Sequence, residues 1–299
     1  MLTITVVSTK GGVGKTTLAA NLGGLLHDLG LRVLMIDADI QPSLSRYYQI
    51  SHQAEHGLSQ LVRGGVLTAD CISHCRLPPS SYLGKLDKIP SSDGGKLDIV
   101  QSDTRDGKLQ DWMATRNPMD MMLRLKRPLQ HPNVTHAYDV VLIDTQGAVG
   151  HLQDAAVMAA DHLLVPVSPD IVSAREFITG TQSLLERHEC VTDVGMKMAP
   201  MRAVLSRTEK TTDSRDMSEL IRENFINMRG RVNMLSTVVP AAVAYRKAAT
   251  AQVPVHWIDP AKGSDTMHEL LWELIPSVAG IYASNHREYT DLNATSSNS

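Results

Sequence analysis

The sequence predicts an α/β fold, a mostly parallel twisted sheet with helices on both faces. Apolar β-branched runs alternate along the chain with segments of helical pattern, which is typical of strands joined by crossover helices. The chain has 299 residues, of which 42% are hydrophobic, so it can bury one large core. We expect a single domain over residues 1–285 and a polar, disordered tail over residues 286–299.

Strands and helices are expected in alternation from the first residues onward. The predicted strands are 2–8, 32–37, 97–100, 139–144, 162–167, 201–205 and 235–239. The predicted helices are 15–29, 151–160, 173–188, 213–228, 241–250 and 264–281. Residues 73–95 are rich in Pro, Ser and Gly and are predicted to form an irregular surface excursion.

A glycine-rich loop joins the first strand to the first helix. In "VSTKGGVGKTTLAANL", Gly14, Lys15 and Thr16 fill the second half of the phosphate-loop pattern G-x-x-x-x-G-K-[ST], while Thr9 stands in the slot of the first glycine. Backbone N–H groups and a helix N-terminus at such a loop face an anion. Lys15 is expected to reach the β- and γ-phosphates of a nucleotide, and the Thr16 hydroxyl to ligate Mg²⁺. The predicted phosphate-binding residues are Lys10, Gly11, Gly12, Val13, Gly14, Lys15, Thr16 and Thr17.

Carboxylates follow two of the predicted strands. Asp37 and Asp39 come directly after "VLMI", and Asp144 follows "VVLI". Strand ends of a parallel sheet are its usual ligand edge, so Asp37 and Asp144 are predicted to hold Mg²⁺ directly or through its water. The alternatives are an exposed acidic turn for the first pair and a helix cap for Asp144.

Composition excludes several protein classes. Three cysteines show no paired framework, the first residues form no leader, and no apolar run approaches the ~20 residues that span a bilayer, which predicts a cytoplasmic protein without a membrane anchor. Cys71, His74 and Cys75 lie close in sequence, but no second ligand pair supports zinc. The methionines from Met113 to Met122 are predicted to pack in helices.

These motifs resemble the ParA/MinD family of deviant Walker A ATPases. The loop "KGGVGKTT" is similar to the family's deviant Walker A box, "RVLMIDADIQPSLS" to its D-x-D-P-Q segment, and "YDVVLIDTQG" to its Walker B strand. The segment "VVPAAVAYRKAATAQVPVHWIDP" is similar to its closing region. The resemblance is closest to short, Soj-like ParA partition ATPases, and it implies a P-loop NTPase fold with ATP and Mg²⁺ as cofactors.

The resemblance also implies roles for individual residues. The extra lysine at Lys10 would contact the partner subunit's nucleotide in an ATP sandwich homodimer, and Asp39 would orient the attacking water. Arg207 and Pro240 would contact the adenine. The chain has Ile40 where the family usually has proline, which leaves the shape of that loop open.

A local excess of positive charge suggests a nucleic-acid surface. From Lys197 to Lys247 there are ten Lys or Arg and five Asp or Glu, in a chain whose net charge is −3. The candidate DNA-binding residues are Arg222, Arg229, Arg231, Arg246 and Lys247, which would neutralise phosphates without reading bases. Solvated helix faces are the alternative interpretation.

The sequence therefore predicts a weak ATPase that partitions a plasmid, chromosome or other mobile replicon. ATP would close a homodimer that binds DNA non-specifically on the nucleoid, and a centromere-binding ParB-like protein would stimulate hydrolysis and release. A MinD-like positioning ATPase is an alternative, although its C-terminal amphipathic helix with a basic face has no counterpart in the polar tail. A metabolic ATP-dependent ligase on the same fold is another.

Overall fold

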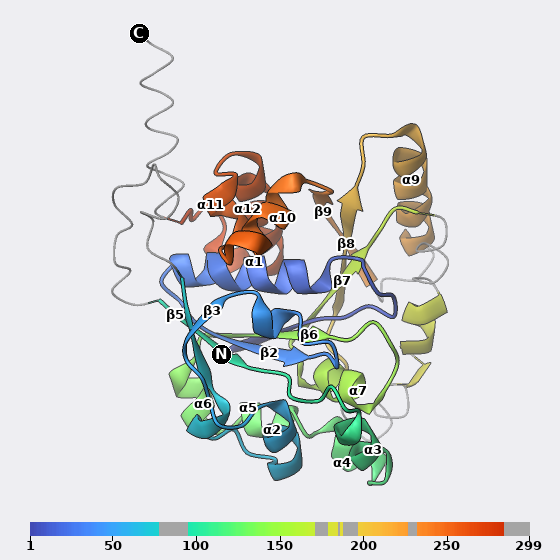
Figure 1. Ribbon diagram of the computed structural model, residues 1–299. Coiled ribbons are helices and arrows are strands. Elements are labelled where there is room, and N and C mark those ends of the chain that lie inside the picture. Colours follow the sequence, from blue (N-terminus) through green and yellow to red (C-terminus); the bar gives the residue numbers. More distant parts are fainter. Residues whose placement is uncertain (78–94, 171–178, 185, 188–196, 227–231, 284–299) are drawn as a thin grey trace.

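The computed structural model describes residues 1–77, 95–170, 179–184, 186, 187, 197–226 and 232–283, and within them the core is one nine-stranded sheet (Figure 1). Its strands are β1 (Leu2–Val6), β2 (Arg32–Ala38), β3 (Gln49–His52), β4 (Ser73–Arg76), β5 (Lys96–Val100), β6 (Val140–Thr145), β7 (His162–Val167), β8 (Met201–Thr208) and β9 (Val232–Pro240). They lie in the order β3-β4-β5-β2-β6-β1-β7-β8-β9.

Seven of these strands are parallel, and β3 and β4 add an antiparallel edge. The central strands are almost wholly buried because helices cover both faces of the sheet. This explains the apolar runs at residues 33–36 in β2 and 140–143 in β6, which precede the carboxylates Asp37 and Asp144. The predicted α/β fold is confirmed.

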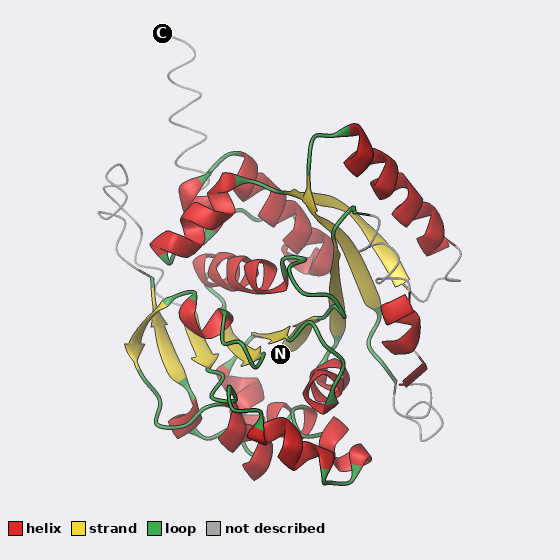
Figure 2. Cartoon of the chain, turned by 45° about the vertical axis from the view of Figure 1, so that its right-hand side comes forward, coloured by secondary structure: helices red, strands yellow, loops and turns green. Residues whose placement is uncertain are grey.

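Helices cover the two faces unequally (Figures 1 and 2). The α-helices are α1 (Lys15–Asp28), α2 (Leu58–Gly64), α3 (Lys108–Ala114), α4 (Pro118–Met122), α5 (Lys126–Leu129), α6 (Pro132–Ala137), α7 (His151–Ala159), α9 (Thr212–Ile226), α10 (Val243–Ala251), α11 (Val255–Ile258) and α12 (Lys262–Leu274). Within the described residues, three short 3₁₀ turns occupy Leu44–Arg46, Ala69–Cys71 and Pro276–Val278.

The buried apolar side chains separate the helices into two layers. One cluster joins α1, α10, α11 and α12 to the sheet face that carries Ile4, Leu142 and Leu164. Two further clusters join α2 to α7, and also α9, to the opposite face, which carries Ile143 and Leu163. Helices α9 and α10 therefore lie on opposite faces of the sheet.

Several predicted elements need correction. The helix predicted over 264–281 ends at Leu274, because Pro276 lacks the N–H that would continue it. Strands β3 and β4 were not predicted, and β4 begins inside the stretch predicted to be irregular. The predictions for residues 78–94 and for the tail 286–299 lie outside the described residues. Of the predicted helix 173–188, residues 179–184, 186 and 187 are described and are helical.

The sheet brings three loops to one edge. Strand β6 pairs in parallel with both β1 and β2, so the carboxyl ends of these three strands lie side by side. The loops after Val6, Ala38 and Thr145 therefore meet at the edge where parallel α/β sheets bind ligands. None of the described helices is both long enough and apolar enough to span a membrane.

Candidate functional site

The glycine loop between β1 and α1 has the backbone conformation of an anion-binding loop. Gly12 and Gly14 have φ values of 76° and 96°, which side chains other than glycine rarely adopt. Gly14 forms the N-cap of α1 without a capping side chain, which leaves N–H groups at that helix terminus for a ligand. The predicted strand, loop and helix are thus in the arrangement that the motif requires.

A second loop approaches the first so closely that it needs glycine. A Cβ atom on Gly147 would lie 2.7 Å from the backbone nitrogen of Gly11 and 2.9 Å from the carbonyl carbon of Lys10. The loop after β6 therefore lies directly against the phosphate loop. Gln146, whose role the sequence left open, is buried beside it.

Lys15 and Thr16 join the loop to the Walker B carboxylate. The Lys15 ammonium is buried and donates to the Lys10 carbonyl oxygen at 2.9 Å. Burial lowers the pKa of Lys15, against the raising effect of the Asp144 and Asp39 carboxylates. The Thr16 hydroxyl donates to Asp144 Oδ2 at 2.6 Å.

Two buried carboxylates stand next to each other at the ends of β2 and β6. Asp37 and Asp144 are register partners and are both fully buried. Burial raises the pKa of Asp144 to about 8, and the neighbouring Asp37 adds to the shift while the Thr16 hydrogen bond opposes it. Burial also raises the pKa of Asp37 to about 6, although N–H and hydroxyl donors of Ser45 and the Asp39 N–H favour its charged form.

The oxygen set at this point fits a hard divalent cation. Asp144 Oδ1 is buried and has no hydrogen-bond partner among the described residues, so one carboxylate oxygen is left for a ligand. Mg²⁺ is bound by one or two carboxylates together with water and phosphate oxygens, and Asp37, Asp144 and Thr16 supply such a partial set. In the described chain no three His, Cys, Asp or Glu side chains gather as a metal site.

Asp39 lies at the rim of the cleft beside these groups. Its Oδ1 accepts the Gln41 N–H at 2.9 Å, and its carbonyl oxygen accepts the Ser102 hydroxyl at 2.5 Å. These contacts give the loop after β2 a defined shape although Ile40 replaces the usual proline. The Asp39 carboxylate is partly exposed and faces the cleft, where a water molecule can reach it.

A cleft of about 650 Å³ extends from the phosphate loop across the ends of β8 and β9. It is large enough for a nucleotide. Residues that line it include Gly11, Gly12, Gly14, Lys15, Thr16, Thr17, Asp39, Tyr47, Ser206, Arg207, Pro240, Tyr245 and Arg246. Val13 is buried behind the loop. The structure thus brings the predicted Arg207 and Pro240 together with the phosphate loop.

Arg207 crosses the cleft to the phosphate loop. Its Nη1 donates to the Gly12 carbonyl oxygen, and its backbone has a left-handed φ of 59°. The sequence did not single out Tyr47, Tyr245 or Arg246 for this cleft, because each becomes a neighbour of the loop only through the fold.

Lys10 forms an ion pair within its own chain. Its Nζ lies 3.4 Å from Asp170 Oδ1, on the segment that follows β7. The Lys10 side chain is 28% exposed and the Asp170 side chain 50% exposed, so the pair lies at the surface next to the phosphate loop. Asp170 was not predicted as a site residue because it is 160 residues away in the sequence.

The candidate DNA-binding residues do not share one surface. Arg222 lies on α9, while Arg246 and Lys247 are exposed on α10, which covers the opposite face of the sheet. Arg246 also lines the nucleotide cleft. Arg229 and Arg231 lie outside the described residues. The described members of the predicted stripe therefore form two separate groups.

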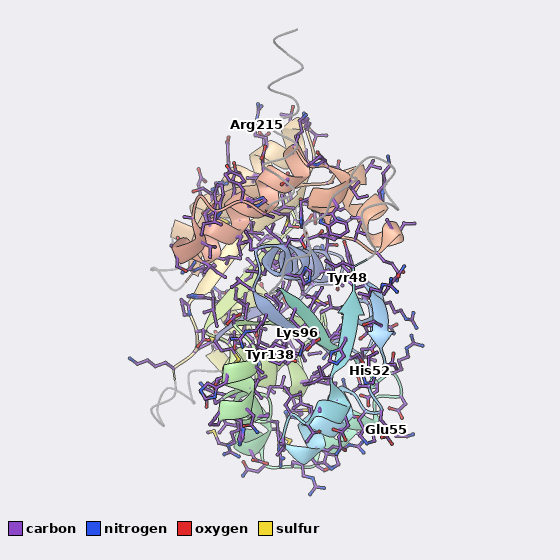
Figure 3. The ribbon with its side chains drawn as sticks, turned by 90° about the vertical axis from the view of Figure 1, so that its left-hand side faces the viewer. Tyr48, His52, Glu55, Lys96, Tyr138 and Arg215 are labelled. Carbon is purple, nitrogen blue, oxygen red and sulfur yellow. The ribbon has the colours of Figure 1, made fainter. Side chains whose placement is uncertain are left out.

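The cysteine and histidine cluster lies at the far edge of the sheet. His74 Nδ1 is 2.7 Å from Asp98 Oδ1, and Lys96 Nζ is 2.6 Å from the other oxygen of the same carboxylate. Figure 3 shows Lys96 beside Tyr138, whose hydroxyl also donates to Asp98. Cys71 and Cys75 are free thiols. Asp98 is thus neutralised by its neighbours, and the described contacts are those of a structural ion-pair cluster.

Two methionines of the predicted packing group, Met113 and Met121, are almost fully buried. Both belong to the apolar cluster that joins α3 and α4 to the sheet. The prediction that these residues pack in helices is confirmed for this pair.

Comparisons with known proteins agree with this geometry. A family model described as an AAA domain matches residues 1–197. A Rhizobium rhizogenes protein designated a replication protein A is 31% identical over 192 residues, which are 62% of this chain and 45% of that protein. The chain thus spans less than half of that relative. A Thermus thermophilus protein designated a plasmid-partitioning ParA is 26% identical over 272 residues, 90% of this chain and 76% of that protein.

Solved structures show the same fold. The ATP complex of Cyanothece McdA(D38A) superposes with a TM-score of 0.70 at 20% identity, over 92% of this chain and 96% of that one. The Pyrococcus horikoshii septum site-determining protein MinD, complexed with Mg-ADP, has a TM-score of 0.62 at 19% identity, over 95% and 99% of the two chains. With its phosphate loop, its strand-end carboxylates and the matched family model, the chain belongs to the ParA/MinD family of partition ATPases, within the AAA domains.

Proposed function

We propose that this chain is an ATP-dependent dimerising switch for DNA partition. MgATP binding closes a homodimer, the dimer binds DNA non-specifically, and slow hydrolysis, stimulated by a centromere-binding ParB-like protein, releases it. The ATPase domain spans residues 1–285, and the switch works in the cytoplasm on the nucleoid. The replicon it serves is a plasmid, a chromosome or another mobile element.

One observation carries the nucleotide half of this proposal. The buried Asp144 carboxylate, held by the Thr16 hydroxyl, keeps one oxygen without a partner in the described structure and stands beside a second buried carboxylate, Asp37. Two adjacent buried carboxylates are unfavourable unless a cation neutralises them. Asp37, Asp144 and Thr16 would hold a magnesium ion bound with the nucleotide, and that ion would supply the neutralising charge.

The positions of the other site residues support the roles that we propose for them. Lys15 lies next to the same carboxylates and reaches the phosphates, the glycine N–H groups cradle them, and Arg207 and Pro240 border the base. Asp39 holds the attacking water. Lys10, at the mouth of the loop, exchanges its own-chain partner Asp170 for the nucleotide of the second subunit.

The trans role of Lys10 gives the sharpest test of the switch. Lys10→Ala should bind MgATP, because Lys15 and Thr16 remain, and should stay monomeric in light scattering coupled to gel filtration. Asp170→Ala is the matched control: it breaks the same ion pair but keeps the lysine, so it should dimerise with ATP as the wild type does. Dimerisation of Lys10→Ala at wild-type ATP concentrations would contradict the proposal.

Hydrolysis and binding are separated by a second pair of variants. Lys15→Ala should lose Mg²⁺-dependent ATP binding in calorimetry. Asp39→Ala should keep binding and lose hydrolysis by about 10²–10⁴-fold, the usual contribution of a positioned proton-transfer group. An Asp39→Ala protein that hydrolyses ATP at the wild-type rate would remove the water-positioning role.

A further inference from the structure

Three arginines lie over one tryptophan on the helical layer that contains α2 to α5, and a fourth shares a carboxylate with one of them. The guanidinium carbons of Arg63, Arg116 and Arg124 lie 5.9, 5.0 and 5.7 Å from the Trp112 ring centroid. Arg127 follows on α5. We call Arg63, Arg116, Arg124 and Arg127 the arginine cluster. None of these residues lines the nucleotide cleft.

The charge of the arginine cluster is not balanced. Arg124 and Arg127 share a single carboxylate, Asp120, at 2.7 and 2.8 Å. Within the described part of the chain Arg116 makes no ion pair and no side-chain hydrogen bond, and Arg63 donates to one carbonyl oxygen at 3.5 Å. In the described structure the four guanidinium groups therefore have one carboxylate partner, Asp120, which binds Arg124 and Arg127. Residues 105–131 as a whole carry six Lys or Arg and three Asp, in a chain with a net charge of −3.

Trp112 offsets part of the repulsion among three of these like charges, Arg63, Arg116 and Arg124. An arginine over an indole ring gains about 0.5–1 kcal/mol at exposed sites, which offsets part of the repulsion between neighbouring guanidinium groups. Arg63, Arg116 and Arg127 are exposed, so solvent or a ligand can reach their N–H groups. Arg124 Nε is buried and has no hydrogen-bond partner among the described residues. The arrangement is therefore preorganised for an added anion.

The chemistry favours phosphate oxygens of a nucleic-acid backbone. A planar guanidinium with five donors fits phosphate in a bidentate manner, which makes arginine the preferred residue for this contact. A lipid surface would need apolar anchors beside the charges. Across residues 105–131, all of which are described, no large apolar side chain is exposed, and near Arg63 the exposed one is Val66, a single valine rather than an apolar face.

We propose that the arginine cluster is a second phosphate-binding surface for duplex DNA, separate from α10. The inference rests on the proposed function, since it names where the switch touches DNA. Leu109, Met113 and Leu125 anchor this layer to the sheet face opposite the one covered by α10, and Figure 1 shows α3 and α4 on the other side of the sheet from α10. The whole surface belongs to one subunit. Weak DNA binding through it therefore needs neither ATP nor a dimer.

The test measures DNA affinity without nucleotide. Fluorescence anisotropy of a labelled mixed-sequence duplex, titrated at several salt concentrations, compares the wild type with Arg116→Gln/Arg127→Gln. Each lost phosphate contact lowers the slope of log affinity against log salt by about 0.9, so the double variant should lose about 1.8. Its affinity at low salt should fall at least about tenfold. The matched control Arg76→Gln/Lys262→Gln removes two exposed charges elsewhere and should bind as the wild type does.

Two further measurements make the outcome decisive. Unchanged ATP affinity of the double variant shows that it is folded, and Trp112→Phe, which keeps an aromatic ring but weakens the cation–π contact, should give a smaller loss of the same sign. Equal affinity and equal salt slope in wild type and double variant would overturn the proposal. So would binding to phosphatidylglycerol vesicles without binding to DNA, which would assign the surface to a membrane.

The outcomes also separate this inference from the switch itself. Nucleotide-independent DNA binding that depends on the arginine cluster, but does not tighten with ATP, would support the surface and contradict the dimerising switch. ATP-dependent DNA binding that the double variant retains in full would support the switch and refute the surface.

Discussion

Asp144→Asn should stabilise the nucleotide-free protein while removing its response to MgATP. Asparagine keeps the shape of the side chain and its carbonyl oxygen can still accept the Thr16 hydroxyl. What disappears is a fully buried carboxyl group next to Asp37, which must take up a proton on folding at neutral pH. A carboxylate in this position serves to bind a cation, and it lowers the stability of the fold when no cation is bound.

The size of the effect follows from proton linkage. The pKa of Asp144 rises from 3.8 in the unfolded chain to about 8 in the folded chain. At pH 7 the unfolded chain has released this proton, so the protein must take it up when it folds. About three pKa units at 1.36 kcal/mol each give an upper limit of about 4 kcal/mol. The new amide leaves one N–H unpaired, which costs about 1–3 kcal/mol. The free energy of unfolding should therefore rise by about 1–3 kcal/mol.

The pH dependence has a defined sign. A carboxyl whose folded pKa is raised contributes stability below its unfolded pKa and loses it as pH rises through the folded value. Wild-type stability in EDTA should therefore fall between about pH 4 and pH 8. Asp144→Asn should lose part of this slope, and the remainder should come from Asp37, whose pKa is raised to about 6.

The assay is urea unfolding in EDTA at several pH values, repeated at pH 7 with MgATP. MgATP should raise the midpoint of the wild type and leave that of Asp144→Asn unchanged. Asp37→Asn is the matched control. Asp37 accepts three hydrogen bonds, two from Ser45 and one from Asp39. In the variant the amide NH₂ group would replace one accepting oxygen and face a hydrogen-bond donor, so the substitution should destabilise the fold. If both variants shift stability in the same direction, the reasoning from the unpaired Asp144 oxygen is wrong.

Two further predictions concern acid stability and loop contact. Burial opposes ionisation of Asp28, but hydrogen bonds from His256 and His27 outweigh it and lower its pKa to about 2. About 2 kcal/mol of folding stability should therefore be lost as pH falls from about 4 to about 2. Asp28→Asn should lack this loss of stability in acid when thermal unfolding is measured across that pH range. Gly147→Ala should weaken MgATP binding at least about tenfold in calorimetry, because the new Cβ atom would displace the Gly11 backbone. Gly64→Ala is the control: its Cβ atom would lie 3.8 Å from its nearest neighbour, so this variant should bind MgATP as the wild type does. Equal MgATP affinity of the two variants would refute the argument.

The parts of the site that could be predicted are those coded by local pattern. The strand, glycine loop and helix around Lys15 follow one another in the chain, and Asp37 and Asp144 each follow an apolar strand. Their adjacency could not be read locally, because it depends on β6 inserting between β1 and β2 after a connection of about forty residues.

The missed elements are short or exposed. Strands β3 and β4 have four residues each, and β3 is exposed at the sheet edge, so neither shows a clear alternation. Helices α2 to α6 have four to seven residues, too few for a helical period to stand out from the background. The arginine cluster depends on these helices, since Arg63 and Trp112 are neighbours only after α2 and α3 have packed on the same sheet face.

The departure of the phosphate loop from its motif has a structural counterpart that no local pattern reveals. Thr9 occupies the slot of the first glycine, and its side chain needs space that a glycine would not use. That space exists at Gly180: a Cβ atom there would collide with the Thr9 hydroxyl and lie 2.8 Å from its Cβ. Residues 179–184, which are helical, can approach the loop closely because the Thr9 side chain fills the space that a side chain at position 180 would need. A side chain in the loop and a missing side chain 171 residues later form one packing unit, so the imperfect motif is compatible with an intact phosphate loop.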